Sequence, residues 1–191
     1  MTILCDGTLA TFCIDTRFKM ISPFVNRKEI DEESGMSYGL QPCSYDMRCR
    51  EEVTIGPATV WNSIKQAFGY GHPTFVLIST IETVQIPDFL MASVHDKSSW
   101  ARRGVVVQNT HFDPGFRGVP TIEITNHGSE TIQLKKGTPI CQLIFHKLDQ
   151  PSRAPYSGKY QDQQAGPQYW RKDHASQEGL LQEDHLKEHQ D

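Results

Sequence analysis

Short runs of strand-forming residues follow one another at intervals of about ten residues in the second half of the chain. They are Val105 to Val107, Thr121 to Thr125, Thr131 to Leu134 and Ile140 to Leu148, and turns of the sequences Asp-Pro-Gly, Asn-His-Gly and Lys-Lys-Gly separate them. Such spacing with Gly and Pro turns is typical of sandwiches, jelly rolls and barrels, and not of a chain that alternates strands with helices. We therefore expect a mainly β fold.

The remaining elements that the sequence predicts are short and depend on local signals such as helix caps and prolines. They are a helix from about Cys5 to Lys19 with Asp6 as its N-cap, an extended edge segment from Met20 to Val25, a strand within Tyr38 to Cys49, a helical turn from Ser63 to Phe68, and one long strand or two from Thr74 to Pro87.

The length of 191 residues, 37% of them hydrophobic, fits one domain followed by a tail. We expect the domain to span residues 1–166. Its last part, 151–166, is rich in Gly and polar residues but also contains aromatic residues, which predicts an arm that becomes ordered over another surface. Residues 167–191 carry three Lys/Arg and six Asp/Glu, which predicts an acidic polar tail that is disordered or a frayed helix.

Charge and hydropathy exclude several classes of protein. The net charge of −4 leaves −1 for residues 1–166 once the −3 of the tail is subtracted, so we expect no general nucleic-acid binding. No apolar run approaches the roughly 18 residues of a membrane span, and no secretion signal is evident, so we expect no membrane association and a cytoplasmic location. The five cysteines form no C-x-x-C pair, which argues against a disulfide framework and a structural zinc site.

The stretch from Asp96 to Gly128 concentrates hydroxyls, cations and carboxylates. Ser98 and Ser99 can cap a short helix that ends at Gly104, with the side chains of Lys97 and Arg102 close by. A helix start with hydroxyls and cations can bind phosphate, although the same pattern also describes an ordinary capped helical turn. The chain has neither a G-x-x-x-x-G-K-S/T loop nor a G-x-G-x-x-G motif.

Glu123 interrupts an apolar run in the sequence Pro-Thr-Ile-Glu-Ile-Thr. Side chains alternate along a strand, so Glu123 shares one face with Thr121 and Thr125 while Ile122 and Ile124 share the other. If the isoleucines face the core, Glu123 faces water. If the Glu123 face lines a pocket, partial burial raises the pKa of this carboxyl and suits it to general-base chemistry.

Three more charged residues each have two interpretations. Asp113-Pro114-Gly115 is a turn signature, and a carboxylate there can also accept hydrogen bonds from a sugar hydroxyl. Asp46 and Arg48 lie two residues apart in a predicted strand, which predicts either a structural ion pair or a role at an interface or site.

Six segments, in this order along the chain, resemble the dCTP deaminase branch of the trimeric dUTPase superfamily over most of residues 3 to 167. The segments are Ser44-Tyr-Asp-Met-Arg48, Lys97-Ser-Ser-Trp-Ala-Arg102, Asp113-Pro-Gly-Phe-Arg-Gly118, Glu123-Ile-Thr-Asn126, Gly137 to Gln142 with Phe145, and Tyr156-Ser-Gly-Lys159-Tyr-Gln-Asp-Gln163. The resemblance implies a distorted jelly roll of the dUTPase-like β-clip type with a few short helices. It also implies a homotrimer with sites between subunits, and a nucleoside triphosphate that chelates Mg²⁺.

The resemblance implies the deamination of dCTP by water, which gives dUTP and ammonia. By this resemblance Glu123 is the general base, and Ser98 and Arg102 position the water and the pyrimidine. Lys97 and Ser99 contact phosphates, and Asp113 contacts the 3′-hydroxyl of the deoxyribose. Tyr156, Lys159 and Gln163 close the site. We expect no protein ligands to the metal, since the substrate phosphates hold Mg²⁺. Zinc is not expected either, because nucleobase deaminases that use it carry H-x-E and P-C-x-x-C motifs, whereas Pro42-Cys43 is followed by the next cysteine six residues on.

Several alternatives remain open at this stage. The loop Gln108-Asn-Thr-His111 departs from the pattern of the enterobacterial deaminases, so the sequence does not decide between dCTP and a 5-substituted dCTP. The short spacing from Tyr156 to Lys159 also resembles bifunctional members that convert dCTP to dUMP and pyrophosphate, and a plain dUTPase is a further possibility. Inhibition by dTTP is undecided. A nucleotide-sensing interaction protein, with the tail as a docking segment, is the alternative from another class.

Overall fold

The structure is a computed structural model that describes residues 2–172, so part of the predicted acidic tail, 173–191, lies outside the described residues. The helices of the described chain are α1 (Asp6–Ile14), α2 (Val60–Ala67) and α3 (Ser98–Ala101). The strands in the same range are β1 (Thr2–Ile3), β2 (Ile21–Ser22), β3 (Lys28–Ile30), β4 (Ser37–Gln41), β5 (Ser44–Arg48), β6 (Val53–Ile55), β7 (Phe75–Ser79), β8 (Thr83–Gln85), β9 (Leu90–Asp96), β10 (Val105–Val107), β11 (His111–Phe112), β12 (Arg117–Gly118), β13 (Thr121–Asn126), β14 (Ile132–Leu134) and β15 (Pro139–Lys147).

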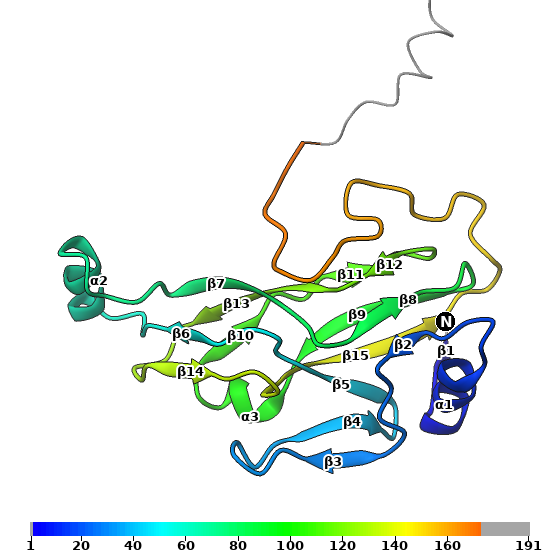
Figure 1. Ribbon diagram of the computed structural model, residues 1–191, viewed down its shortest axis with the longest axis horizontal. Helices are drawn as coiled ribbons and strands as arrows, with labels where there is room; N and C mark the ends of the chain where they lie inside the picture. Colours follow the sequence, from blue (N-terminus) through cyan, green and yellow to red (C-terminus); the bar gives the residue numbers. More distant parts are fainter. Residues whose placement is uncertain (1, 173–191) are drawn as a thin grey trace, which may run out of the picture.

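The largest sheet has the order β11-β9-β15-β5-β4-β3, and β1 also pairs with β15. Its two longest strands, β9 and β15, run side by side through the centre of the molecule (Figure 1). Smaller sheets of order β10-β13-β7 and β12-β8-β2 and the pair β14-β6 complete the body. The pairs between these strands are antiparallel, as expected for a mainly β fold with short turns.

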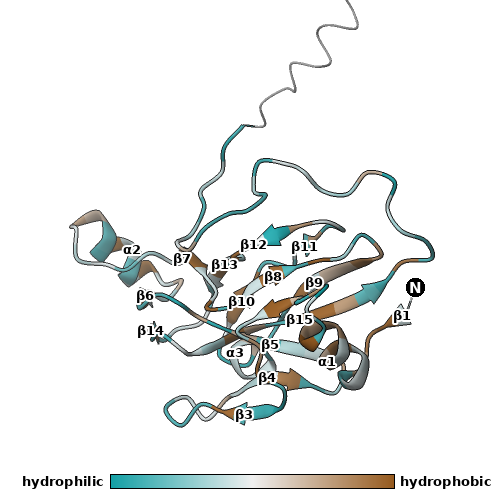
Figure 2. Cartoon of the chain, turned by 45° about the vertical axis from the view of Figure 1, so that its right-hand side comes forward, coloured by the Kyte–Doolittle hydropathy of each residue, from teal (hydrophilic) through white to brown (hydrophobic). Residues whose placement is uncertain are grey.

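The core is formed by the inward faces of these sheets. Hydrophobic residues gather on the central strands, while the segment after β15 is largely hydrophilic (Figure 2). Fully buried side chains include Leu90 on β9, Phe145 on β15 and Ile122 and Ile124 on β13. Burial of such side chains is the main favourable contribution to folding. Among the described residues, no helix combines the length and hydropathy that a membrane span requires.

The strands expected after residue 104 are present. The segment from Thr74 to Pro87 forms two strands, β7 and β8, rather than one. The strand β9 was not expected, although Leu90, Ala92 and Val94 alternate there with less buried residues such as Ser93 and His95. The alternation of apolar and polar residues from Ala92 to His95 is the sequence signal for this half-buried strand.

The predicted extent of the first helix was wrong. α1 ends at Ile14, not near Lys19, because the Asp15 carboxylate accepts hydrogen bonds from the backbone N–H and the guanidinium of Arg17 and so forms a turn. The N-cap is Cys5, and Asp6 is the first helical residue, with its carboxylate accepting from the N–H of Gly7.

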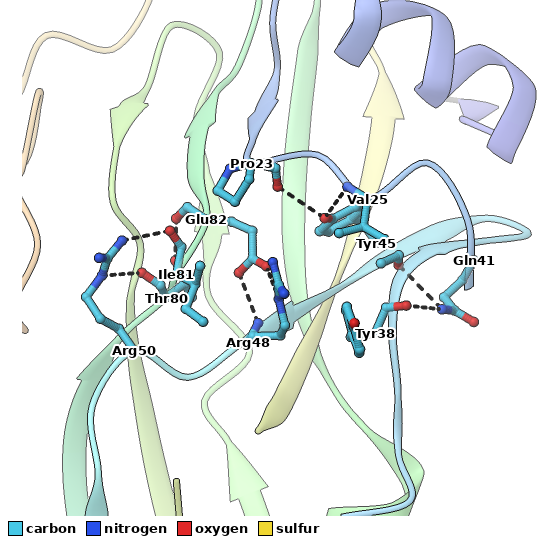
Figure 3. A network of polar contacts seen from close by, with 11 residues as sticks. Pro23, Val25, Tyr38, Gln41, Tyr45, Arg48, Arg50, Thr80, Ile81 and Glu82 are labelled. Carbon is cyan, nitrogen blue, oxygen red and sulfur yellow. Dashed lines mark hydrogen bonds and ion pairs between the residues drawn. The ribbon is translucent and has the colours of Figure 1, made fainter. Parts of the chain in front are cut away.

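Asp46 and Arg48 do not pair with each other. The Asp46 carboxylate binds the Lys97 ammonium, with 2.6 Å between Oδ2 and Nζ, and the Arg48 guanidinium binds Glu82, with 2.7 Å between Nε and Oε1. Figure 3 shows Arg48 reaching Glu82, and Arg50 donating to carbonyls of the same loop between β7 and β8. These bonds fix β5 against the β7–β8 connection, which determines where β7 lies.

Candidate active site

A pocket of about 590 Å³ lies between β7, β13, the segment around β11 and the chain after β15. Its wall is largely aromatic and includes Phe75 at the start of β7, Phe116, and Tyr156 and Trp170 from the arm and the residues after it. Aromatic walls with a few polar groups are typical of sites for small organic ligands. The polar groups that line this pocket include Glu123 and Asp113.

Glu123 lies in the middle of β13, opposite Leu77 of β7. Its neighbours Ile122 and Ile124 face the core, while the Glu123 side chain is half-buried and faces the pocket. Both interpretations of the alternating pattern therefore hold in part, since the isoleucines are buried and the opposite face is covered as well. The alternating pattern of residues alone does not show what covers the second face of the strand.

The Glu123 carboxyl has an unusual environment. Its Oε2 atom is buried and has no hydrogen-bond partner within the described chain. Burial raises the pKa of Glu123 above its ordinary value of 4.5, and a backbone hydrogen bond lowers it by a smaller amount. Partnerless buried polar atoms are rare in folded proteins, and one that faces a cavity is suited to binding a water or a ligand.

Asp113 occupies the turn before β12. The backbone N–H of Phe116 donates to the Asp113 carbonyl at 3.1 Å, and Gly115 has the positive φ of +91° that this turn requires. The Asp113 side chain is half-exposed, lines the pocket, and lies 3.3 Å from Nε2 of His111. The turn interpretation is confirmed, and the carboxylate also remains accessible to a ligand hydroxyl.

The arm, residues 151–166, contributes Tyr156, Tyr160 and Gln163 to the lining of the pocket of its own chain. Its backbone runs beside β11 and β12 in Figure 1. The ring of Tyr156 packs 5.9 Å from that of Phe116, and its hydroxyl accepts from the N–H of Tyr160. Gln163 is buried and bonded to Val119 twice, through its side chain at 2.5 Å and through its carbonyl at 2.9 Å. Both residues therefore attach the arm to the body next to the pocket.

Lys159 lies between these two residues on the arm. Its ammonium is 5.2 Å from the ring centre of Tyr160 and 5.8 Å from that of Trp170, two residues that line the pocket. Cation–π contacts of this kind contribute about 0.5–1 kcal/mol each at exposed sites. The ammonium thus lies among aromatic side chains that border the pocket.

The residues of α3 are not part of this pocket. Ser98 and Ser99 are the first residues of α3, Arg102 is its C-cap, and all three are exposed. α3 and the arm lie at opposite sides of the body in Figure 1. One chain therefore presents two separate parts: a pocket with Glu123 and Asp113, and a short helix with hydroxyls and a guanidinium.

Lys97 differs from the residues that follow it. It is the N-cap of α3, but its side chain is buried and directed to Asp46 on β5 rather than to the surface. The sequence placed Lys97 with Ser98 and Ser99 in one region, which is correct for the backbone. It gave no indication that the ammonium points into the interior.

Some residues that shape the site were not predicted. The aromatic wall formed by Phe75 and Phe116 was missed, because isolated aromatic residues in strands and turns look like ordinary core. Glu51 accepts from the N–H of Ser79 at 2.7 Å, and the Ser79 hydroxyl accepts from the N–H of Gly166 in the arm at 3.2 Å. No local sequence signal identifies such a link.

The described residues contain no group of three or more His, Cys, Asp or Glu side chains that could hold a metal ion. The residues that line the pocket supply at most the carboxylates of Glu123 and Asp113. Hard cations such as Mg²⁺ prefer several oxygen ligands, of which the residues lining this pocket offer these two carboxylates.

Comparisons with known proteins agree with this picture. The dCTP deaminase-like family model matches residues 20–148. A dCTP deaminase of Thermococcus kodakarensis is 33% identical over 144 residues, which cover 74% of this chain and 92% of the relative. A dCTP deaminase, dUMP-forming, of Persephonella marina is 31% identical over 162 residues, which cover 76% of this chain and 90% of the relative.

The crystal structure of 2′-deoxycytidine 5′-triphosphate deaminase from Agrobacterium tumefaciens is similar in fold. The TM-score is 0.50 at 19% sequence identity, and the match covers 76% of this chain and 48% of the other. This likeness confirms the expected mainly β fold with a few short helices. With the family match over most of its length, the chain belongs to the dCTP deaminase family of enzymes.

Proposed function

We propose that this enzyme deaminates dCTP by hydrolysis, giving dUTP and ammonia, with Glu123 as the general base. The observation that carries the proposal is the buried Oε2 of Glu123, which faces a pocket of about 590 Å³ and has no hydrogen-bond partner within the described chain. A water molecule between this oxygen and a bound pyrimidine satisfies the carboxylate and is placed for attack. The relatives' names supply the substrate class.

The proton balance needs one carboxyl group. As the water oxygen forms its bond to C4 of cytosine, the Glu123 carboxylate takes a proton from the water. The protonated carboxyl then returns this proton to the amino group, the C4–N bond breaks, and ammonia leaves. The second proton of the water moves from the new C4 hydroxyl to N3, which gives the uracil ring. Burial of Glu123 raises its pKa, which strengthens the base and also makes the protonated form a usable acid at neutral pH.

We further propose that α3 of a neighbouring subunit completes the site. Ser98 and Arg102 orient the water and the ring, and Ser99 contacts a phosphate, but all three lie outside the pocket of their own chain. A homotrimer with sites between subunits brings the two parts together, as the family resemblance implies. The separation of α3 from Glu123 in one chain supports this assembly.

The arm and the Asp113 turn bind the rest of the nucleotide in this proposal. Asp113 accepts from the 3′-hydroxyl of the deoxyribose, and its half-exposed carboxylate is accessible for this. Tyr156, Lys159 and Gln163 close over the ligand. When bound, Mg²⁺ neutralises the triphosphate charge, and the phosphates provide its main ligands. A cytoplasmic location is part of the same proposal.

A second candidate is a bifunctional enzyme that continues from dUTP to dUMP and pyrophosphate. The Persephonella marina relative, which matches 76% of this chain at 31% identity, is a dCTP deaminase of the dUMP-forming kind. The short spacing between Tyr156 and Lys159 favours the same alternative.

One experiment tests both candidates. The protein is incubated with dCTP and Mg²⁺, and separately with dUTP and Mg²⁺, and the products are separated by ion-exchange chromatography with ammonia and pyrophosphate assays. Ammonia and dUTP from dCTP, with dUTP left intact, support the monofunctional deaminase. Appearance of dUMP and pyrophosphate supports the bifunctional one. Absence of ammonia from dCTP overturns both.

A further inference from the structure

The helix α2 carries its apolar side chains on the outside of the molecule. Trp61, Ile64 and Phe68 follow one another at helical spacing and share one side, with Val60 before them and Tyr70 after them. Their exposed fractions range from 40% for Ile64 to 79% for Val60, and the rings of Phe68 and Tyr70 are stacked with 6.3 Å between their centres. We call these five residues the α2 face. A helix of a folded protein normally turns such a side toward the core.

Hydrogen bonds through Asn62, on another side of α2, hold the helix in place. Asn62 is the buried residue of α2. Its side-chain amide donates to the His72 carbonyl at 2.9 Å, and its side-chain oxygen accepts from the His72 N–H at 3.3 Å. A Cβ atom at Gly56 would lie 2.6 Å from Nδ2 of Asn62, so the body approaches closely on this side. Polar contacts thus fix the position of α2, while the α2 face stays outside.

The connections that follow α2 and α3 are bound at the same end of β13. After α2, the carbonyl of Thr74 accepts from the N–H of Asn126 at 2.9 Å. After α3, the carbonyl of Gly104 accepts from the N–H of His127 at 2.8 Å. Asn126 and His127 are consecutive residues, the last of β13 and the one after it. Figure 1 shows α2 standing out from the body beyond the start of β7.

The chain after α2 also leads directly to the rim of the pocket. Phe75, the first residue of β7, is half-exposed and lines the pocket that contains Glu123. It lies five residues after Tyr70 of the α2 face. In the proposed function a neighbouring subunit brings its α3 to this pocket. The α2 face therefore lies close, along the chain, to a place where a second subunit is already required.

The α2 face is large for a surface that remains in contact with water. It contains three aromatic side chains, each of which covers about 150–250 Å² when buried. Its exposed apolar area is therefore on the order of 500 Å², a patch size that marks an interaction site on a folded protein. A stable interface covers about 800 Å² on each partner, so the α2 face forms a major part of one and needs additional surface beside it.

The composition of this segment indicates what kind of partner covers it. Residues 57–75 contain no Asp or Glu, and Lys65 is the single Lys or Arg among them. Nearly uncharged surfaces rich in Trp, Phe and Tyr are typical of permanent contacts between copies of one chain. A partner recognised by its charge needs a surface of complementary charge instead. The composition therefore favours a second copy of this chain.

We propose that the α2 face is a contact surface between subunits and that a second copy of this chain covers it. This inference rests on the proposed function and extends it, because α3, bound at the same end of β13, supplies Ser98 and Arg102 to a neighbouring pocket in that proposal. Contact through the α2 face keeps the two subunits together while α3 completes the site. Trp61 and Phe68 carry the largest share of this contact, since buried aromatic residues dominate the energetics of interfaces.

Photochemical cross-linking of the full chain identifies what covers the α2 face. Phe68 is replaced by p-benzoylphenylalanine, the purified protein is irradiated, and the products are separated on a denaturing gel and mapped by mass spectrometry. We expect a product of twice the chain mass, in which position 68 is joined to residues 2–172 of a second copy, with a yield that does not change on dilution. The same group at Ile14, an exposed residue at the end of α1, is the matched control and should give no such product.

Charged substitutions test the consequence for the site. Trp61→Glu and Phe68→Glu should each reduce the assembled fraction, measured by size-exclusion chromatography with light scattering. They should also lower kcat/KM for dCTP at least tenfold at low protein concentration, and the activity should recover as the protein concentration rises, because only association is weakened. Ile14→Glu should match the wild type in both measurements. Circular dichroism checks that the variants fold, as expected for substitutions at exposed residues.

Three outcomes overturn the proposal. The first is cross-linking from position 68 only within one chain or only to residues 173–191, which identifies the tail as the segment that covers the α2 face. The second is the absence of any cross-link. The third is an unchanged assembly and an unchanged kcat/KM in the double variant Trp61→Glu, Phe68→Glu. Cross-linking requires no turnover, so a wild-type protein that gives the doubled product but releases no ammonia from dCTP contradicts the proposed function alone.

Discussion

The backbone N–H of Tyr156 donates to the carbonyl of Pro114, with 2.7 Å between the nitrogen and the oxygen. The arm is thus attached directly to the turn that carries Asp113. A Cβ atom at Gly115, the next residue of that turn, would lie 2.7 Å from Cβ of Pro155 and 3.0 Å from the nitrogen of Tyr156. The close approach of arm and turn therefore requires glycine at this position.

We expect Gly115→Ala to displace the arm. The new methyl group collides with Pro155, and the φ of +91° is unfavourable for alanine, so the substitution should cost about 1–3 kcal/mol in strain and lower kcat/KM by between about tenfold and a hundredfold. Steady-state kinetics measure the loss, and faster tryptic cleavage in the arm measures the displacement.

Gly137→Ala is the matched control for this change. Gly137 has a similar φ of +97°, but no atom lies within 4 Å of the added Cβ. It should therefore show the conformational strain without the collision. Equal losses of activity in the two variants would mean that displacement of the arm is not the cause.

Glu123→Gln should retain nucleotide binding and lose activity by at least about 10²–10⁴-fold, because the amide cannot take the proton from water. Calorimetric titration with dCTP and Mg²⁺ measures binding, and ammonia release measures turnover. Glu130→Gln, at an exposed position paired with Arg103, serves as the control and should be near wild type. Near-normal turnover of Glu123→Gln would contradict the assignment of the base.

The pH dependence of activity should follow the same carboxyl. The general base has to be ionised in the free enzyme, and burial raises the pKa of Glu123 above 4.5. We therefore expect kcat/KM to fall as the pH decreases through this raised pKa, so that the acid limb lies above pH 4.5. A profile that stays flat down to pH 4.5 would be inconsistent with Glu123 as the base.

The sequence predicted the fold class and most strands because turn residues and apolar alternation are local signals. The alternation around Glu123 showed that Thr121, Glu123 and Thr125 share a face. It could not show that the arm covers that face, since the contacts between Gly166 and Ser79 join residues far apart in the chain. What covers a strand face is decided by tertiary contacts.

The same reason applies to α3. The segment from Lys97 to Arg102 contains the features of a phosphate site, and the hydroxyls are indeed exposed at a helix start. The direction of the Lys97 side chain depends on Asp46 of β5, and the sequence did not determine which residue pairs with Asp46. The buried Asp46 carboxylate thus orients the Lys97 ammonium inward, whereas the sequence motif alone suggested that it lies at the surface.

The imidazole of His146 should make the stability of the protein depend on pH. Its Nδ1 is buried without a partner within the described chain, and its Nε2 lies 2.9 Å from the Ser93 hydroxyl, which also contacts His95 at 2.9 Å. Burial lowers the pKa of His146 from its ordinary 6.5, and the neighbouring His95 adds to this effect. The folded protein therefore binds fewer protons than the unfolded chain once the pH drops below 6.5.

It follows that the free energy of unfolding should decrease as the pH falls from 6.5 through the lowered pKa of His146. Urea unfolding at several pH values measures this slope, and His146→Gln should flatten it. His127→Gln, at an exposed position, should leave the slope as it is in the wild type. An unchanged slope in His146→Gln would show that other groups cause the dependence.

Mixing two inactive variants should restore activity if each site takes Glu123 from one subunit and Ser98 from another. Glu123→Gln and Ser98→Ala are unfolded together in equal amounts, refolded and assayed with dCTP. Every trimer that contains both variants then has one site with both residues intact, so random assembly should recover about a quarter of the wild-type activity. Each variant refolded alone is the control and should stay inactive.

The same mixture separates the two possible arrangements of the site. If Glu123 and Ser98 of the same chain met in one site, every site in every mixed trimer would carry at least one substitution, and the mixture would be as inactive as its parents. The structure favours the shared site, because the Glu123 pocket and the exposed start of α3 are separate surfaces of one chain. Size-exclusion chromatography with light scattering establishes whether the refolded species are trimers. A recovered activity can be assigned to shared sites only if they are.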